Sequence, residues 1–269
     1  MVKIYEVKNL YFSYGKNQVL KDINTEILKG EFVGIVGPNG SGKTTFLKIL
    51  AKILFYEKGV VLYKGKDIKK INNIDYARQV GYLPSEIKFT FELKVIDFLI
   101  FGFFPYTGRF GKEDKEAIRQ ISEKLNIKEF LNKKITQLSE GEKQRIYIGQ
   151  ILVQNPEVIL LDEPTSHLDI GYQFSILDIL KDLNLKGITI ISIFHDLNLA
   201  SNYCTKILLF KEGEIYKSGS TEEVLTYKNI EEVYNTRVLV YKNPFTEKIN
   251  VFGIPNYILK SNKNLQSDN

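Results

Sequence analysis

One glycine-rich segment constrains this chain more than any other feature: Gly37-Pro38-Asn39-Gly40-Ser41-Gly42-Lys43-Thr44, with Thr45 after it. It fits the pattern G-x-x-x-x-G-K-[ST], and it stands between an apolar stretch at 32–36, which predicts a buried strand, and apolar residues at helical spacing over 44–54. In such a strand, loop and helix, glycines let bare backbone N–H groups wrap a row of phosphates at the positive end of the helix. Weighed against a structural glycine turn, nucleotide binding by residues 37–45 is the favoured interpretation.

Charged and hydroxyl side chains supply the rest of a phosphate site. Lys43 adds positive charge at the outer phosphates, and the hydroxyl of Thr44 can ligate Mg²⁺. A second apolar stretch at 158–161 ends in Asp162, whose carboxylate can reach the same metal. Glu163 follows at the exposed tip, where it can orient or deprotonate an attacking water. An Asp-Glu pair is by itself weak evidence for catalysis, because acidic residues are common in solvated loops. With Lys43 upstream, the pair predicts an ATPase that uses ATP and Mg²⁺.

Changes in hydrophobic periodicity divide the chain. Residues 1–36 alternate apolar and polar side chains between turn signals, which predicts antiparallel strands. From about 87 to 154 the spacing is mostly helical, and from 158 to 210 strand and helix patterns alternate. We therefore expect an α/β fold: a RecA-like P-loop NTPase core with an N-terminal antiparallel β subdomain and an inserted helical subdomain over 87–154. These parts form one domain over 1–258, and the polar tail 259–269 should be disordered.

Composition limits the compartment and the partners. The 269 residues carry 37 basic and 32 acidic side chains, a net charge of +5, and the basic residues are scattered rather than gathered in the stripe that nucleic-acid binding needs. A single cysteine, Cys204, cannot form an internal disulfide, and the first residues lack the pattern of a signal peptide, so a reducing cytosol is expected. The longest aromatic and apolar run, 98–106, is about half of the roughly 20 residues that a membrane-spanning helix needs.

Three segments resemble, in the same order, the motifs of ATPase subunits of ABC transporters. They are 37–45, Leu138-Ser139-Glu140-Gly141-Glu142-Lys143-Gln144-Arg145 and Leu161-Asp162-Glu163-Pro164-Thr165-Ser166-His167-Leu168-Asp169, and the similarity covers roughly residues 1–255. In that family the second segment opens a helix and donates its serine and backbone amides to the γ-phosphate held by the other subunit. The resemblance implies that Ser139, Gly141 and Glu142 help to bind ATP. It also implies a homodimer in which one chain holds only half of each finished site.

The same resemblance assigns roles to one aromatic and two imidazole side chains. His195 ends the apolar stretch 188–194 and matches the switch histidine that contacts the γ-phosphate, although a histidine at a strand end is often structural. Tyr14 matches the aromatic residue that stacks on adenine, although sequence alone does not separate it from an ordinary strand-edge tyrosine. His167 lies in the stretch that resembles the dimer-communication loop, so it should face the partner subunit.

Two positions depart from the family pattern. Glu140 stands where the family usually has glycine; its carboxylate either stabilises the helix start, by roughly 0.3–1 kcal/mol, or weakens closure on ATP. Ser85 stands where the family has a glutamine that touches Mg²⁺ and the water. Because a serine side chain is two bonds shorter, either a bridging water or the neighbouring Glu86 substitutes for it, or turnover is slow.

Further resemblance points to import. The segments 105–110, 164–169 and 195–200 resemble ATPases of metal-chelate importers, which take up iron-siderophore, haem or cobalamin. The implied partners are a two-copy transmembrane permease and, indirectly, a substrate-binding protein, with the ATPase on the cytoplasmic face of the cell membrane. The run 98–106 is then either a buried helix or part of a groove for a permease helix. No residue selects the chelate.

The sequence is also compatible with other functions of an ABC ATPase. One is a soluble ATPase of iron–sulfur cluster assembly, and another is a nucleotide-binding regulatory subunit with little hydrolysis, which Ser85 and Glu140 would explain. A DNA-repair ATPase of this type would carry long heptad segments between the two halves of the site, and the sequence contains none.

Overall fold

A six-stranded sheet forms the centre of the molecule, in the order β10-β9-β3-β8-β7-β6. The computed structural model describes residues 2–87, 92–106, 111–255 and 257–258. The strands are β3 (Phe32–Val36), β6 (Val80–Leu83), β7 (Val158–Leu161), β8 (Thr189–Ile193), β9 (Lys206–Lys211) and β10 (Glu214–Gly219). All neighbours are parallel except the edge pair β9 and β10. Every residue of β3, β7 and β8 is buried, as expected of parallel strands that are covered on both faces.

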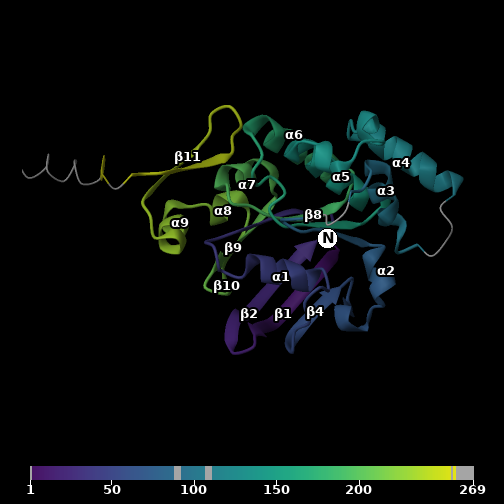
Figure 1. Cartoon of the computed structure of the whole chain (residues 1–269). Coiled ribbons are helices and arrows are strands. Elements are labelled where there is room, and N and C mark those ends of the chain that lie inside the picture. Colours follow the sequence, from purple (N-terminus) through teal and green to yellow (C-terminus); the bar gives the residue numbers. More distant parts are fainter. Residues whose placement is uncertain (1, 88–91, 107–110, 256, 259–269) are drawn as a thin grey trace, which may run out of the picture.

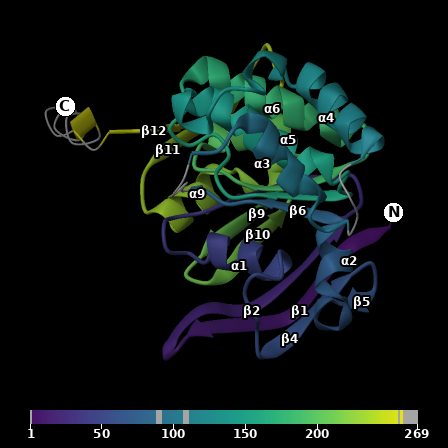
Figure 2. The same cartoon turned by 45° about the vertical axis from the view of Figure 1, so that its right-hand side comes forward.

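Helices cover the two faces of this sheet and create two separate hydrophobic cores. On one face lies α1 (Lys43–Leu50), whose Phe46 and Leu47 pack with the antiparallel strands. On the other lie α5 (Glu140–Val153) and α6 (Ile170–Leu185). Figures 1 and 2 show α1 below the sheet and the larger helices above it. Two helix N-termini, those of α1 and α5, therefore belong to opposite layers of the same chain.

The N-terminal part is an antiparallel sheet, as the alternation over 1–36 predicts. Its order is β2-β1-β4-β5, with β1 (Lys3–Tyr14), β2 (Asn17–Leu28), β4 (Lys58–Tyr63) and β5 (Lys66–Asp67), followed by a 3₁₀ turn at Ile68–Lys70 and α2 (Asn73–Ala77). Buried hydroxyls tie it to α1: those of Tyr5 and Tyr76 are 2.6 Å apart, and Tyr76 donates to the Leu50 carbonyl. The predicted α/β class, with an antiparallel sheet beside a parallel core, is confirmed.

The segment between β6 and β7 is helical. It contains α3 (Val95–Ile100), α4 (Lys112–Lys124) and α5, with 3₁₀ turns at Phe101–Phe103, Lys128–Phe130 and Ile135–Gln137. The aromatic run 98–106 divides by exposure: Phe98 and Leu99 are buried, whereas Phe101 and Phe104 are 51% and 88% exposed. The run thus combines both readings of the sequence, a buried helix and an apolar surface. Part of the segment 105–110, namely 107–110, lies outside the described residues.

The C-terminal part contains α7 (Leu197–Tyr203) before β9, within the stretch 158–210 where strand and helix patterns were expected to alternate. After β10 it brings elements that the sequence analysis did not predict: α8 (Thr221–Val224), α9 (Tyr227–Tyr234) and the hairpin of β11 (Val238–Lys242) and β12 (Ile249–Gly253). In Figure 1 the hairpin lies beside α7. The predicted disordered tail, 259–269, lies outside the described residues. Within the described part of the chain, every helix is too short or too polar to cross a bilayer.

Candidate functional site

The glycine-rich loop joins the end of β3 to the start of α1, as predicted. Gly42 is the N-cap of α1 and has φ of +100°, and Gly37 has φ of +145°. A Cβ on Gly37 would lie 2.3 Å from the Phe210 carbonyl oxygen, so no other residue fits there without moving β9. Left-handed backbone and close approach together need glycine, and they leave the amides at the helix N-terminus free of side-chain cover.

Lys43 is buried within this loop. Its ammonium donates to the carbonyls of Gly37 and Pro38, at 2.8 and 2.9 Å. Burial lowers the pKa of Lys43, and the nearby carboxylates of Glu163 and Asp162 act in the opposite direction. A cation held this way is ready for anionic phosphate oxygens, which satisfy it better than carbonyls do.

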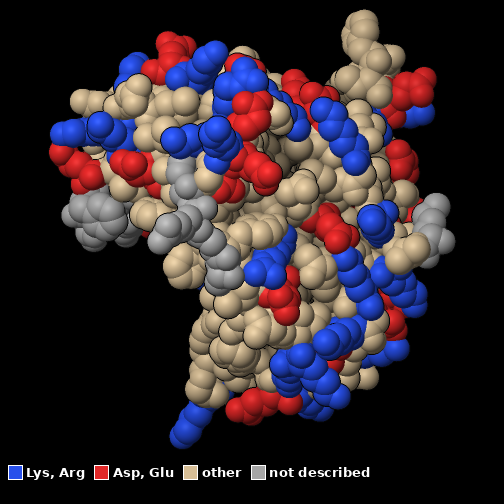
Figure 3. All heavy atoms as spheres, turned by 90° about the vertical axis from the view of Figure 1, so that its right-hand side faces the viewer, with Lys and Arg blue, Asp and Glu red and all other residues tan. Residues whose placement is uncertain are grey.

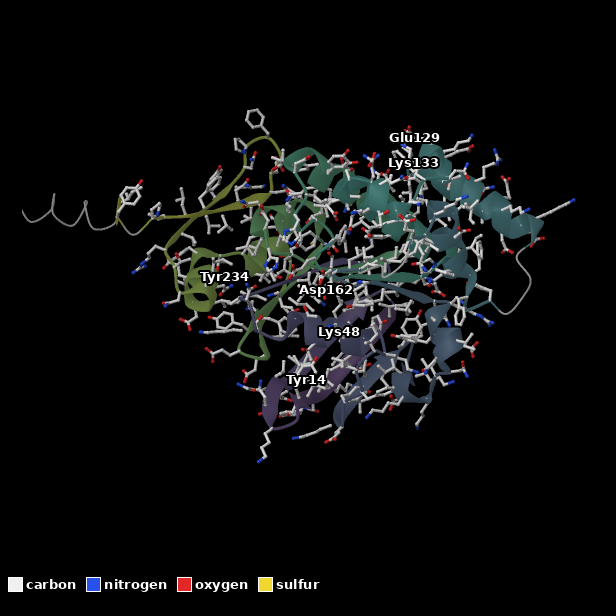
Figure 4. The ribbon with its side chains drawn as sticks, in the orientation of Figure 1. Tyr14, Lys48, Glu129, Lys133, Asp162 and Tyr234 are labelled. Atoms are coloured by element: carbon white, nitrogen blue, oxygen red, sulfur yellow. The ribbon has the colours of Figure 1, made fainter. Side chains whose placement is uncertain are left out.

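Two oxygens that suit a hard divalent cation lie side by side at the end of β7. The hydroxyl of Thr44 donates to Oδ1 of Asp162 at 3.1 Å, which brings together residues 118 positions apart. Burial raises the pKa of Asp162, opposed by the Thr44 hydrogen bond, and the charge of Lys48 on α1 also favours its ionised form. Figure 4 shows Lys48 and Asp162 close together near the centre of the molecule. A hydroxyl beside a buried carboxylate fits Mg²⁺, because the ionised carboxylate needs a positive charge nearby. The other ligands of the ion would be phosphate and water.

Glu163 and His195 meet at the ends of two adjacent strands, β7 and β8. Nε2 of His195 lies 2.6 Å from Oε1 of Glu163, and the Ser166 hydroxyl donates to Oε2 at 3.1 Å. Glu163 has φ of +55°, an uncommon value for a residue other than glycine, which aims its carboxylate out of the strand end. Sequence reasoning assigned both residues separately, and the structure brings them into direct contact.

The Ser139 segment begins α5 with a capping box. The Ser139 hydroxyl donates to Glu142 Oε2 at 2.9 Å, the Ser139 backbone N–H donates to the same oxygen at 2.8 Å, and the Glu142 N–H donates back to Ser139 Oγ. In this chain Glu142 thus acts on Ser139, whose exposed position lets it reach another molecule. Glu140 is exposed and pairs with Lys143 at 2.7 Å, so part of its charge is compensated beside the helix start.

A cavity of about 760 Å³ opens between the sheet and the helical segment. Ser85, Glu86 and Glu163 line it, together with Lys143 and Gln144 from α5. Ser85 is exposed at the rim, so its hydroxyl faces the space that a longer side chain would span. Figure 3 shows a hollow in the upper half of the face that it draws, with basic and acidic side chains interspersed around it.

Two further predicted residues are exposed. Tyr14 ends β1, is 49% exposed and packs edge-on against Phe12 with ring centroids 4.8 Å apart. In Figure 4 it lies on the antiparallel sheet, below Lys48. Exposure on this rim suits an adenine-stacking role. His167 is exposed on the loop before α6, with φ of +64°, and lines the same cavity as Glu163; its contact with a partner subunit stays a prediction.

Three residues near the site were missed by the sequence analysis. Lys48 follows Thr44 by four residues, a helical spacing that would have pointed to it. Tyr82 lies on β6 with a buried hydroxyl, and burial, followed by the charge of Asp162, raises its pKa. Tyr172 on α6 contacts Gly141: a Cβ there would lie 2.2 Å from its ring. Neither tyrosine had a sequence signal, because both contacts depend on which strands and helices become neighbours.

The chain is similar to known proteins over most of its length. The family described as ABC transporter matches residues 20–166. An uncharacterized ABC transporter ATP-binding protein of Bacillus subtilis is 36% identical over 87% of this chain, which spans about half (54%) of that protein's length. The iron(3+)-hydroxamate import ATP-binding protein of Bacillus subtilis is 34% identical, with 90% of this chain and 91% of that protein covered. Among solved structures, an inward-facing ABC transporter assigned to the metal-chelate type has a TM-score of 0.81 at 26% identity, covering 94% of this chain and 97% of that one.

Proposed function

Because the chain belongs to the ABC transporter family of ATP-binding proteins, we propose that this ATPase powers import of a metal chelate through a separate membrane permease. The observation that carries the proposal is the meeting of Lys43, Thr44 and Asp162 with the Glu163–His195 pair at one edge of the sheet.

The chain's own residues divide the work of ATP hydrolysis. The loop 37–45 holds the phosphates with backbone amides, and Lys43 exchanges its carbonyl partners for phosphate oxygens. Thr44 and Asp162 would hold Mg²⁺, which supplies positive charge at the outer phosphates when it is bound. Glu163 takes a proton from the attacking water, and His195, which touches Glu163, contacts the γ-phosphate. Positioning and charge compensation account for most of the rate in such a site.

A second copy of the chain completes the site. The N-terminus of α1 and that of α5 pack in different cores on opposite faces of the sheet, and Ser139 is exposed. Two copies related by a twofold axis can place Ser139 and Gly141 of each on the triphosphate bound by the other. Loss of the γ-phosphate removes contacts that both chains share, and the difference in affinity between ATP and ADP opens the pair.

Import rather than iron–sulfur cluster assembly is supported by the relative named for iron(3+)-hydroxamate import and by the transporter of metal-chelate type. In this proposal the exposed side chains of Phe101 and Phe104 contact a cytoplasmic helix of a two-copy permease, and the ATPase lies at the cytoplasmic face of the membrane. A substrate-binding protein would deliver the chelate, and this chain would not touch it.

The test is hydrolysis by the purified chain with two substitutions. Glu163→Gln should bind Mg-ATP normally but release phosphate about 10²–10⁴ times more slowly, because the base is lost. Lys43→Ala should lose nucleotide affinity instead. Phosphate release and equilibrium binding of a fluorescent ATP analogue distinguish the two effects. Hydrolysis by Glu163→Gln at the parent rate would overturn the assignment of the base, and recovery of only soluble scaffold proteins with the tagged chain would overturn import.

A further inference from the structure

The C-terminal residues 227–253, which we call the C-terminal clasp, pack against the hydrophobic core of the nucleotide-binding part, with β12 beside α7. The clasp consists of α9 and the hairpin of β11 and β12. At the end of α9, burial raises the pKa of Tyr234, and the nearby backbone of Gly37, the first residue of the phosphate loop, acts in the opposite direction. Figure 4 shows Tyr234 on α9, and Figure 1 shows the hairpin beside α7, the helix that follows His195.

The hairpin is joined to α7 by one side chain that makes two hydrogen bonds. The Val251 backbone N–H donates to Oδ1 of Asn198 at 2.7 Å, and Nδ2 of Asn198 donates to the Val251 carbonyl at 3.2 Å. This pairing copies the way one strand residue pairs with another. The side-chain amide of Asn198 therefore pairs with the outer edge of β12 as a residue of a neighbouring strand would.

The register of the hairpin explains why Val251 is available. Asn243 N–H donates to the Lys248 carbonyl, so these two form a hydrogen-bonded pair, and hydrogen-bonded pairs alternate along an antiparallel ladder. Val240 and Val251, three pairs further on, face each other without exchanging hydrogen bonds. The N–H and C=O of Val251 thus point away from β11, toward α7, and Asn198 satisfies both.

Asn198 is also connected to the catalytic end of β8. Asp196 caps α7 by accepting from the backbone N–H of Asn198 at 2.7 Å and of Leu199 at 3.2 Å. His195 immediately precedes this cap and lies 2.6 Å from Glu163. Because α7 has only seven residues, its first turn depends on such contacts for its orientation. The hydrogen bonds of Asn198 and Asp196 thus form one chain from Val251 of the hairpin to the backbone next to His195.

We propose that Asn198 is a positioning residue for ATP hydrolysis, which couples the C-terminal clasp to the γ-phosphate-sensing His195. The inference rests on the proposed function of His195 and Glu163. In it, the clasp holds the start of α7, and with it the switch segment, through the two hydrogen bonds of Asn198. In this role Asn198 acts through the backbone next to His195 and not on the nucleotide itself.

The test uses three single variants and one double variant of the full chain. Asn198→Ala removes both bonds from the α7 side. Val251→Pro removes the N–H donor from the hairpin side, and proline is tolerated at an outward-facing edge position because that N–H is not part of the ladder with β11. Asn202→Ala, on the same helix, is the matched control, since no hydrogen bond from it to β12 is seen in the described part of the chain.

We expect Asn198→Ala and Val251→Pro each to lower kcat by about 3- to 100-fold, the range that displaced catalytic groups produce, with KM for Mg-ATP within about twofold of the parent. The double variant should be no slower than the slower single variant, because both act through one link. Hydrogen exchange should become faster at the backbone amides of α7 in both variants, with or without nucleotide, and stay unchanged in α1.

The results distinguish the positioning role of Asn198 from the proposed ATP hydrolysis. Three results would overturn the positioning role of Asn198 while leaving ATP hydrolysis intact. The first is a kcat and an exchange rate in Asn198→Ala that equal those of the parent. The others are an equal effect of Asn202→Ala and strictly additive losses of kcat in the double variant. A lower melting temperature with unchanged kcat would reduce Asn198 to a structural contact and would also overturn it. No phosphate release by the parent chain would overturn the proposed function instead, and the exchange measurement would still judge the link between α7 and β12.

Discussion

At the residue scale, the buried carboxylate of Asp162, which we propose as a Mg²⁺ ligand, lowers the stability of the chain at neutral pH when no cation is bound. Burial raises its pKa, so the folded chain disfavours the ionised form that Mg²⁺ requires. The sign follows from linkage: an acid whose folded pKa exceeds its unfolded value, about 3.9, contributes stability at low pH that is lost as pH rises through the folded pKa. The charged side chain therefore costs stability at neutral pH until a cation compensates it.

Asp162→Asn should consequently be more stable than the parent at neutral pH without ligand, and its stability should vary less between about pH 4 and 7. A melting temperature higher by about 2–4 °C for each kcal/mol of relief is expected for a chain of this size. Added Mg-ATP should raise the melting temperature of the parent but hardly that of the variant. Asp182→Asn, at an exposed position, is the control. A variant less stable than the parent at pH 7 would contradict the argument.

Ser85 offers a second residue-scale prediction. Its hydroxyl lies at the rim of the cavity that Glu86 and Glu163 also line, and a glutamine there would reach two bonds further. Ser85→Gln should raise kcat, since one well-placed polar contact at a transition state commonly contributes about 2.7–4 kcal/mol. Steady-state phosphate release measures it, with Ser85→Ala as the control that should match the parent. An unchanged rate in Ser85→Gln would mean that another group, such as Glu86 or a bridging water, already fills the role.

At the scale of elements, the junction of α5 and α6 depends on the missing side chain of Gly141. The Tyr172 ring occupies the place of its Cβ, and the Arg145 guanidinium lies over the same ring, 5.7 Å from its centroid. Gly141→Ala should therefore lower the free energy of unfolding by about 1–3 kcal/mol through overpacking. In a Tyr172→Ala background the same change should be nearly neutral, and urea unfolding of the four proteins measures the coupling. Equal losses in both backgrounds would exclude the steric cause.

The sequence predicted the elements that form through contacts between residues close in sequence, and it missed elements that depend on distant contacts. The strand, loop and helix around Lys43 are encoded locally, and so is the capping box of Ser139 and Glu142, which the spacing S-x-x-E announces. The predicted helix over 44–54 ends earlier, at Leu50, because Lys52 takes a left-handed backbone with φ of +58°. The hairpin of β11 and β12 was not predicted, although Asn243-Pro244 marks its turn, where Oδ1 of Asn243 accepts from the backbone N–H groups of Phe245 and Thr246.

The candidate site shows the same limit. The motif order predicted Thr44, Asp162 and Glu163 as one constellation, because the ends of parallel strands meet at one edge of a sheet. The contact between Glu163 and His195 requires that β7 and β8 be neighbours, which no local pattern states. Tyr82 and Tyr172 act through strand and helix partners far away in sequence, so only the folded chain reveals them.

At the scale of the whole molecule, the proposed dimer makes each site from two different chains, which complementation can measure. Lys43→Ala removes the phosphate-holding half and keeps Ser139, whereas Ser139→Arg keeps the first half and blocks the second with a bulky side chain. Neither variant alone should hydrolyse ATP. In an equimolar mixture half of the dimers contain one chain of each kind, and each of these has one intact site of two.

Roughly a quarter of the parent rate per chain should therefore return on mixing if the two sites act independently. Phosphate release at increasing protein concentration measures the recovery, and it should rise with concentration because association is required. A mixture of Lys43→Ala with a Lys43→Ala, Ser139→Arg double variant is the control, since no intact site can form in it. Activity of Ser139→Arg alone at the parent rate would show that a single chain finishes its own site. Absence of recovery in the complementary mixture would mean either that one intact site is not enough or that Ser139 does not reach the partner's nucleotide. Light scattering of the Glu163→Gln chain with Mg-ATP separates these outcomes, because only a nucleotide shared by two chains should double the measured mass.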